Sequence, residues 1–124
     1  MKNAYLQFNS RDEFQRIDIS KIVFFESEGN YTNIVTVNKL KSVVCMNLMT
    51  MQKLLSDNLK SDAKIFARVG KKHIINHSYV FRISISKQEL ILSDGCSFAF
   101  KLNLSKNALK ALKEIYSSSS SKEK

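Results

Sequence analysis

Two pairs of side chains have the types and the spacing that could support catalysis or metal binding. His73 and His77 are four residues apart, the spacing that places two zinc ligands on one face of a helix. However, Ile74, Ile75 and the strand-like sequence around them favour extended chain, and no third ligand is near in the sequence. We therefore interpret the pair as one loop histidine and one surface histidine. Glu26 and Glu28 could form an acid pair, but two carboxylates beside a turn are more typical of a solvated strand end.

Motifs of the common enzyme classes are also missing from the sequence. It contains no GxSxG, P-loop or GxGxxG, and its three glycines cannot form a glycine-rich phosphate cradle. We predict that the protein is not an enzyme and that it uses no cofactor and no metal ion.

The charge, in contrast, is organised. Twenty Lys and Arg against eleven Asp and Glu give a net charge of +9, which favours an anionic partner: nucleic acid first, then a membrane surface or an acidic protein. Two segments, 60–73 and 101–113, concentrate these cations and hold a single acid, Asp62. Their basic residues are Lys60, Lys64, Arg68, Lys71 and Lys72, followed by Lys101, Lys106, Lys110 and Lys113. Together the two segments could face one phosphate backbone, although Lys110 and Lys113 also fit the solvated face of a helix.

The stretch FARVGKKHIIN, residues 66–76, interrupts apolar sequence with two adjacent lysines. Phe66, Val69 and the Ile74-Ile75 pair have the character of core anchors on either side. Gly70-Lys71-Lys72 is then a short exposed bend, which would present two cations on a tethered backbone.

Hydrophobic patterning outside this bend is mainly that of β-strands. Two helices interrupt the strands. Asn47 is a cap for a helix that ends at about Leu59, and Ser105 is a cap for a last helix that ends at about Tyr116. We expect one domain over residues 1–116, mostly β and antiparallel, with a central and a C-terminal short helix, followed by a disordered Ser/Lys tail over 117–124. The expected strands are 4–9, 21–28, 31–37, 40–46, 78–86, 88–93 and 97–102, the last two joined by a tight Asp94-Gly95 turn.

Cysteine usage and hydropathy bear on the location of the protein. Cys45 and Cys96 lie in strand-like sequence without CxxC spacing, so we expect two reduced core cysteines. There is no membrane segment, because no apolar stretch is long enough to span a bilayer, and the N-terminus lacks the apolar centre of a signal peptide. These features predict a cytoplasmic protein.

The order of these segments resembles the LytTR DNA-binding domain of bacterial transcription regulators. The resemblance covers residues 4–116 and depends on DISKIVFFESEGNYTNIVT, a helix, FARVGKKHIIN, SYVFRIS and the DG hairpin. It implies an elongated set of antiparallel sheets whose loops enter successive major grooves. The family often joins this domain to a receiver domain or a membrane segment, so the chain would be either a stand-alone regulator or a response regulator output domain.

The resemblance also implies three DNA-contact regions, of which the second departs from the family. Gly70 stands in place of a histidine and Lys72 in place of a serine, and lysine lacks the rigid fork with which arginine reads guanine. His73 stands in place of a packing aromatic, so its ring either packs or turns to the phosphates. The implied residues are Asn30, Tyr31, Thr32 and Asn33, then Gly70, Lys71 and Lys72, then either Ser105 and Lys106 or Lys101 to Asn103.

The side-chain chemistry of these residues indicates which would contact phosphates and which would contact bases. Arg68, Lys71, Lys72 and Lys106 suit phosphate contacts, whereas Asn30, Thr32, Asn33 and Asn103 suit base edges. The leading hypothesis is a sequence-specific double-stranded DNA-binding domain acting in transcription regulation, with two copies on tandem sites and room for a separate signalling partner.

Two rival functions remain. The altered central motif is compatible with a protein-interaction module that has lost base readout and pairs with a DNA-binding relative. Binding of single-stranded RNA ranks third, because it needs exposed aromatics and only Tyr31 lies near a loop.

Overall fold

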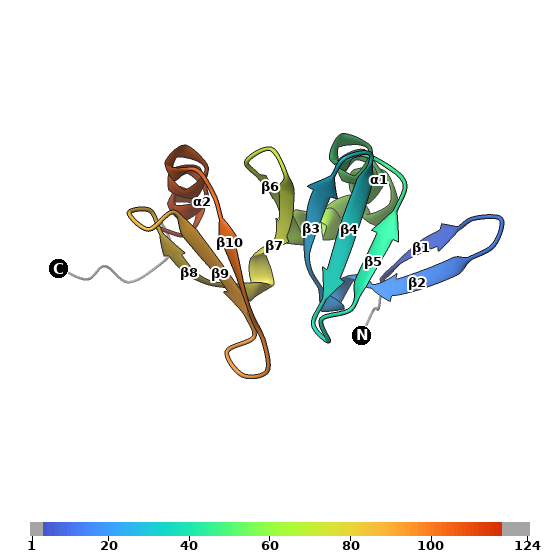
Figure 1. Cartoon of the computed structure of the whole chain (residues 1–124), viewed down its shortest axis with the longest axis horizontal. Helices are drawn as coiled ribbons and strands as arrows, with labels where there is room; N and C mark the ends of the chain where they lie inside the picture. Colours follow the sequence, from blue (N-terminus) through green and yellow to red (C-terminus); the bar gives the residue numbers. More distant parts are fainter. Residues whose placement is uncertain (1–3, 118–124) are drawn as a thin grey trace.

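The protein is built from three antiparallel sheets in a row, as Figure 1 shows along the longest axis. The computed structural model describes residues 4–117. In this part of the chain, the sheets have two, five and three strands, in the orders β1-β2, β5-β4-β3-β7-β6 and β10-β9-β8. The strands are β1 (Tyr5–Asn9), β2 (Phe14–Asp18), β3 (Ile22–Glu28), β4 (Tyr31–Thr36), β5 (Lys41–Val44), β6 (Phe66–Val69), β7 (His73–Asn76), β8 (Val80–Ser84), β9 (Glu89–Ser93) and β10 (Ala99–Asn103).

Two α-helices complete the fold, together with short 3-10 turns. The helices are α1 (Leu48–Leu59) and α2 (Lys106–Ser117), and the 3-10 turns are η1 (Ile19–Lys21), η2 (Lys60–Ile65) and η3 (His77–Tyr79). The mostly β class and the central and C-terminal helices expected from the sequence are confirmed. Within residues 4–117, neither helix is long and apolar enough to cross a membrane.

Strand β3 has a continuous apolar run because both of its faces are covered. Phe25 is fully buried in one core with residues of α1, such as Met51 and Leu55. Phe24 and Val23 belong to a second core on the side of the three-stranded sheet and α2. A register irregularity between Ile22 and Phe24 accompanies this change of face.

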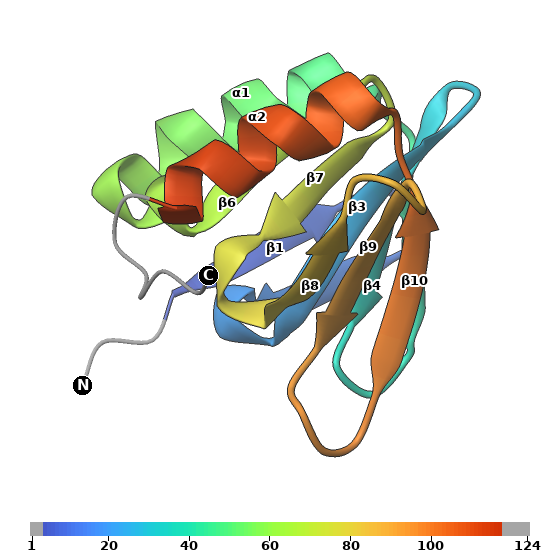
Figure 2. The same cartoon turned by 90° about the vertical axis from the view of Figure 1, so that its left-hand side faces the viewer.

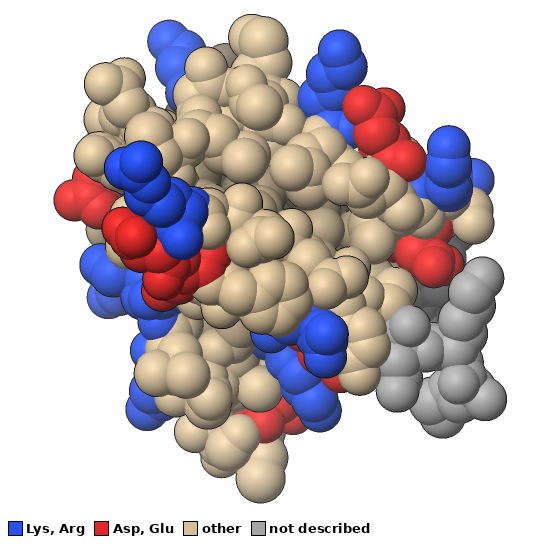
Figure 3. Space-filling model, turned by 90° about the vertical axis from the view of Figure 1, so that its right-hand side faces the viewer, with Lys and Arg blue, Asp and Glu red and all other residues tan. Residues whose placement is uncertain are grey.

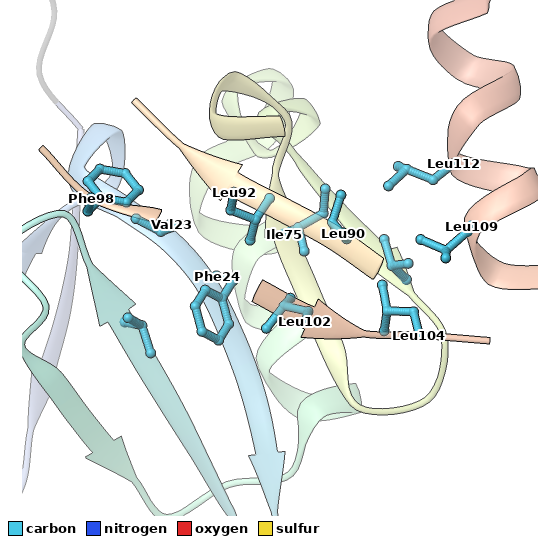
Figure 4. Packing of buried hydrophobic residues seen from close by; sticks show 12 residues of the cluster. Val23, Phe24, Ile75, Leu90, Leu92, Phe98, Leu102, Leu104, Leu109 and Leu112 are labelled. Carbon is cyan, nitrogen blue, oxygen red and sulfur yellow. The ribbon is translucent and has the colours of Figure 1, made fainter. Parts of the chain in front are cut away.

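The second core joins the two larger sheets. In Figure 4, Phe24 and Ile75 from the five-stranded sheet lie near Leu90, Leu92 and Leu102 from the three-stranded sheet, with Leu109 and Leu112 of α2 beside them. The ring of Phe24 meets that of Phe100 edge-on, with centroids 5.4 Å apart. This core fixes the position of β10 and α2 relative to the five-stranded sheet.

Helix α1 begins where the sequence predicted. The side chain of Asn47 accepts a hydrogen bond from the Thr50 amide at 2.8 Å, which satisfies one free amide of the first turn. Leu48, Met51, Leu55 and Leu59 are buried, as their helical spacing indicated.

Two features of the remaining strands differ from the sequence expectations. The hairpin partner of β1, β2, was not predicted, because FQRID carries too few apolar residues to be recognised. The tight Asp94-Gly95 turn is a longer loop: the Asp94 side chain accepts from the amides of Cys96, Ser97 and Phe98, so β10 begins only at Ala99.

Both cysteines are exposed instead of lying in the core, Cys45 directly after β5 and Cys96 in that loop. Ser117, the first residue of the expected tail, is the last residue of α2, and residues 118–124 lie outside the described part.

Candidate nucleic-acid interface

Four connections between elements gather at one end of the sheets. Figure 2 shows them toward its upper right. They are the β3–β4 turn at 29–30, the β6–β7 turn at 70–72, the β8–β9 turn at 85–88 and the link from β10 to α2 at 104–105. Backbone contacts tie them together. The Ser27 amide donates to the Lys72 carbonyl at 2.8 Å, and the Leu104 amide donates to the Gln88 carbonyl at 3.1 Å. A Cβ atom added to Gly70 would lie 3.8 Å from Cβ of Ala108 in α2.

The β6–β7 turn presents two cations on a fixed backbone. Gly70 has φ +66°, a conformation that favours glycine, so the chain reverses sharply here. Lys71 and Lys72 are exposed, and within residues 4–117 neither forms an ion pair. Lysines without an acidic neighbour are free to neutralise phosphates.

Arg68 supports this turn. Its Nη2 donates to the carbonyl of Lys71 at 3.0 Å, and its Nη1 donates to Oε1 of Gln52 in α1 at 3.1 Å. The guanidinium therefore links the turn to the helix. The phosphate contact that its charge suggested stays a prediction.

The β3–β4 turn exposes two of the four residues predicted in this region. Asn30 and Tyr31 are exposed. Thr32 and Asn33 lie in β4, within the strand expected over 31–37, and are buried there instead of exposed on the turn. The Thr32 hydroxyl donates to the Met46 carbonyl at 2.8 Å, and Nδ2 of Asn33 donates to Oε1 of Glu28 at 2.8 Å. These bonds engage the Thr32 hydroxyl and Nδ2 of Asn33, and Oδ1 of Asn33 is buried.

The third predicted region lies beside the first two at the start of α2. Ser105 is the expected cap, since its Oγ accepts from the Ala108 amide at 3.2 Å, and Lys106 begins the helix in an exposed position. Asn103, the exposed last residue of β10, is next to them. Lys101 lies further back on the strand, with Nζ 3.6 Å from Oε2 of Glu89.

His73 packs inward, as the aromatic of the family would. It is buried beside Phe24, and its Nε2 lies 3.0 Å from Oε2 of Glu26. Glu26, whose side chain is 44% exposed, therefore contacts His73, whereas Glu28 contacts Asn33. Among the described residues, no three His, Cys, Asp or Glu side chains are grouped to hold a metal ion.

Lys87 and Gln88, in the β8–β9 turn, were not among the predicted residues. Both are exposed, and the turn lies against the link to α2. The strand order could have indicated them. In an antiparallel meander every second strand runs in the same direction, so β8 and β10 end on the same side of the sheet, and the turn after β8 lies beside the end of β10.

Comparison with known proteins agrees with this arrangement. The family model described as LytTr DNA-binding domain matches residues 12–117, most of the chain. The chain belongs to the LytTR family. A solved structure with the same fold is the LytTr DNA-binding domain of a putative methyl-accepting/DNA response regulator from Bacillus cereus, with 16% identity, a TM-score of 0.63, and coverage of 94% of this chain and 99% of that chain. No curated protein matches the sequence. The elongated antiparallel architecture expected for a LytTR domain is thus confirmed.

Proposed function

We propose that this LytTR domain is a sequence-specific double-stranded DNA-binding domain that regulates transcription by inserting its turns into the major groove. The observation that supports the proposal is the gathering of exposed cations and amide side chains on adjacent turns at one end of the sheets. Phosphate contacts supply most of the affinity of such domains, whereas amide side chains can read base edges.

Roles within the site follow from exposure. Lys71, Lys72 and Lys106 contact phosphates and set the register, with Lys87 extending the contact along the backbone. Asn30 and Asn103 are placed to read bases. Thr32 and Asn33 support the β3–β4 turn from inside β4, and Arg68 supports the β6–β7 turn.

The proposal extends to the assembly. Two copies bind tandem sites on DNA, a separate signalling partner controls them, and the protein acts in the cytoplasm. Residues 1–116 form the DNA-binding unit.

The test is binding to the DNA upstream of the protein's own gene across a salt series. We expect affinity to fall steeply with salt, and the double variant Lys71→Ala with Lys72→Ala to flatten the slope of log K against log salt by about 1.8, because each phosphate contact contributes about 0.9.

A matched control removes the same charge from the opposite end of the five-stranded sheet. Lys21 and Lys41 are exposed there, so Lys21→Ala with Lys41→Ala should leave the slope unchanged. Equal slopes for both double variants would show that the site is misplaced. Failure of the parent protein to bind any duplex at moderate salt would favour the protein-interaction module.

A further inference from the structure

Exposed hydrophobic side chains concentrate on the side of the molecule that carries β1, β2 and β5, with Tyr31 at the border of the DNA-facing turns. Eight large hydrophobic residues of the described chain are exposed, and six of them lie on or beside the β1–β2 hairpin, the β4–β5 pair or the start of α1: Tyr5, Phe14, Tyr31, Leu40, Val43 and Met49. Figure 3 views this end of the molecule, where uncharged atoms run through the middle of the face and most charges lie toward its outline. Such a patch on a basic protein is typical of a protein-binding surface.

A groove runs through this face between strands β2 and β5. Its lower section, beside the β4–β5 turn, has a volume of about 450 Å³. It is lined by Arg16 and Ile17 of β2 and by Leu40 and Ser42 across from them. Its upper section, of about 520 Å³, is lined by Phe8, Glu13, Tyr31, Val43 and Val44. Gln15 of β2 lines both sections, so they adjoin at this residue.

Both walls of the groove are sheet edges. Strand β5 pairs only with β4, and β2 pairs only with β1 among the described strands. An edge strand presents unpaired amides and carbonyls, which an added extended segment can satisfy. The groove therefore has the backbone chemistry that accepts a β-strand.

The two sections differ in chemistry. Arg16 and Lys21 line the lower section, with Lys39 and Lys41 flanking it, against a single acid, Asp18, which already accepts from Ser20. The upper section is lined by no Lys or Arg and by one acid, Glu13, and it offers the apolar side chains of Phe8, Val43 and Val44 between polar ones. Val43 is half-exposed. An extended ligand would fit with acidic residues below and apolar residues above.

We propose that this groove binds an extended segment of another protein, acidic at one end and apolar at the other, which adds to β5 as a further strand. The chain's own C-terminal residues 118–124, SSSSKEK, contain no hydrophobic residue and cannot fill the upper section. A second copy is a poor occupant because, of the described edge strands β1, β2, β5, β6, β8 and β10, only β2 carries an acidic residue to match the lower section, and that residue, Asp18, already accepts from Ser20.

The probe is a synthetic peptide with two Asp followed by alternating Val and Thr, titrated into the full chain labelled with ¹⁵N. We expect amide shifts confined to residues 14–18 and 40–46 with a Kd of about 1 mM or tighter. Replacing the two Asp by Lys should weaken binding about tenfold, and N-methylation of alternate peptide amides should abolish it, because the methylated edge cannot pair.

Surface variants make the test specific. Val43→Lys should weaken the peptide at least about tenfold, whereas Phe81→Ser, which removes an exposed hydrophobic residue outside the face, should leave it unchanged. Both should keep the parent spectrum elsewhere and the parent affinity for DNA, so failure here is separable from failure of DNA binding. Absence of shifts in the groove up to about 5 mM peptide, or equal binding of the lysine peptide, would overturn the proposal. A dimer that Val43→Lys dissociates would also overturn it and would assign the face to a second copy.

Discussion

Arg68 holds the turn that carries Lys71 and Lys72. Its guanidinium donates to the Lys71 carbonyl and to Gln52, so it restrains the backbone that carries both lysines. Removing one such hydrogen bond costs about 1 kcal/mol. We therefore expect Gln52→Ala to weaken DNA binding severalfold in a salt titration without changing the salt slope, since no charge is lost.

The companion variant Arg68→Met separates the two roles of the guanidinium. A positioning role predicts lower affinity with an unchanged slope, whereas a direct phosphate contact predicts a slope flatter by about 0.9. The second outcome would return Arg68 to the set of phosphate contacts.

His77 makes stability dependent on pH. It hydrogen-bonds the Tyr116 hydroxyl of α2, and burial lowers the pKa of His77 from its ordinary 6.5. The unfolded chain thus takes up this proton at higher pH than the folded chain, so stability is lost as pH falls below about 6.5. We expect the melting temperature to fall more between about pH 7.5 and 5.5 in the parent than in His77→Gln. Asp94, whose pKa is held low by hydrogen bonds from Ser97 and neighbouring amides, contributes equally to both proteins and cancels. Parallel profiles would contradict the assignment.

At the scale of elements, the β6–β7 turn depends on its contact with α2. Gly70 and Gly29 have similar positive φ values, +66° and +60°, so an alanine at either should cost about 1–2 kcal/mol of unfolding free energy. Only Gly70 has a neighbour, in α2, near an added Cβ. Gly70→Val should therefore lower the free energy of unfolding, measured in urea, by more than Gly29→Val does. Equal losses would mean that α2 moves aside at no energetic cost.

Local patterns predicted most elements but not their partners. Alternation and capping found β3, β4, α1 and β9, because each depends on neighbouring residues. The strand 31–37 was predicted, but the burial of Thr32 and Asn33 in it was not, because burial depends on how distant elements cover both faces of β4. The sequence predicted which turns carry the candidate residues, but not that these turns lie together. Their contact required the Glu26–His73 register across β3 and β7, which no local pattern contains.

At the scale of the molecule, the five-stranded sheet is common to two cores. The α1 core contains Phe25 and Ile74, and the core of the three-stranded sheet contains Phe24 and Ile75, which are the adjacent residues of the same two strands. Loosening β3 or β7 must therefore disturb both sides. This coupling also keeps the turns of both large sheets in one relative position, which a ligand spanning them requires.

The shared strands predict a single unfolding transition. Phe25→Ala in the α1 core should cost about 3–5 kcal/mol, and Leu92→Ala in the other core about 2–5 kcal/mol, because each leaves a cavity at a fully buried position. Circular dichroism and tyrosine fluorescence should report the same midpoint for each variant, since neither core can unfold while β3 and β7 remain paired. Phe81→Ala, at an exposed position, should change stability by no more than about 0.5 kcal/mol. Two separate midpoints, with Leu92→Ala moving only one, would mean that the three-stranded sheet and α2 fold on their own, and the turns would then be held together by DNA instead of by the cores.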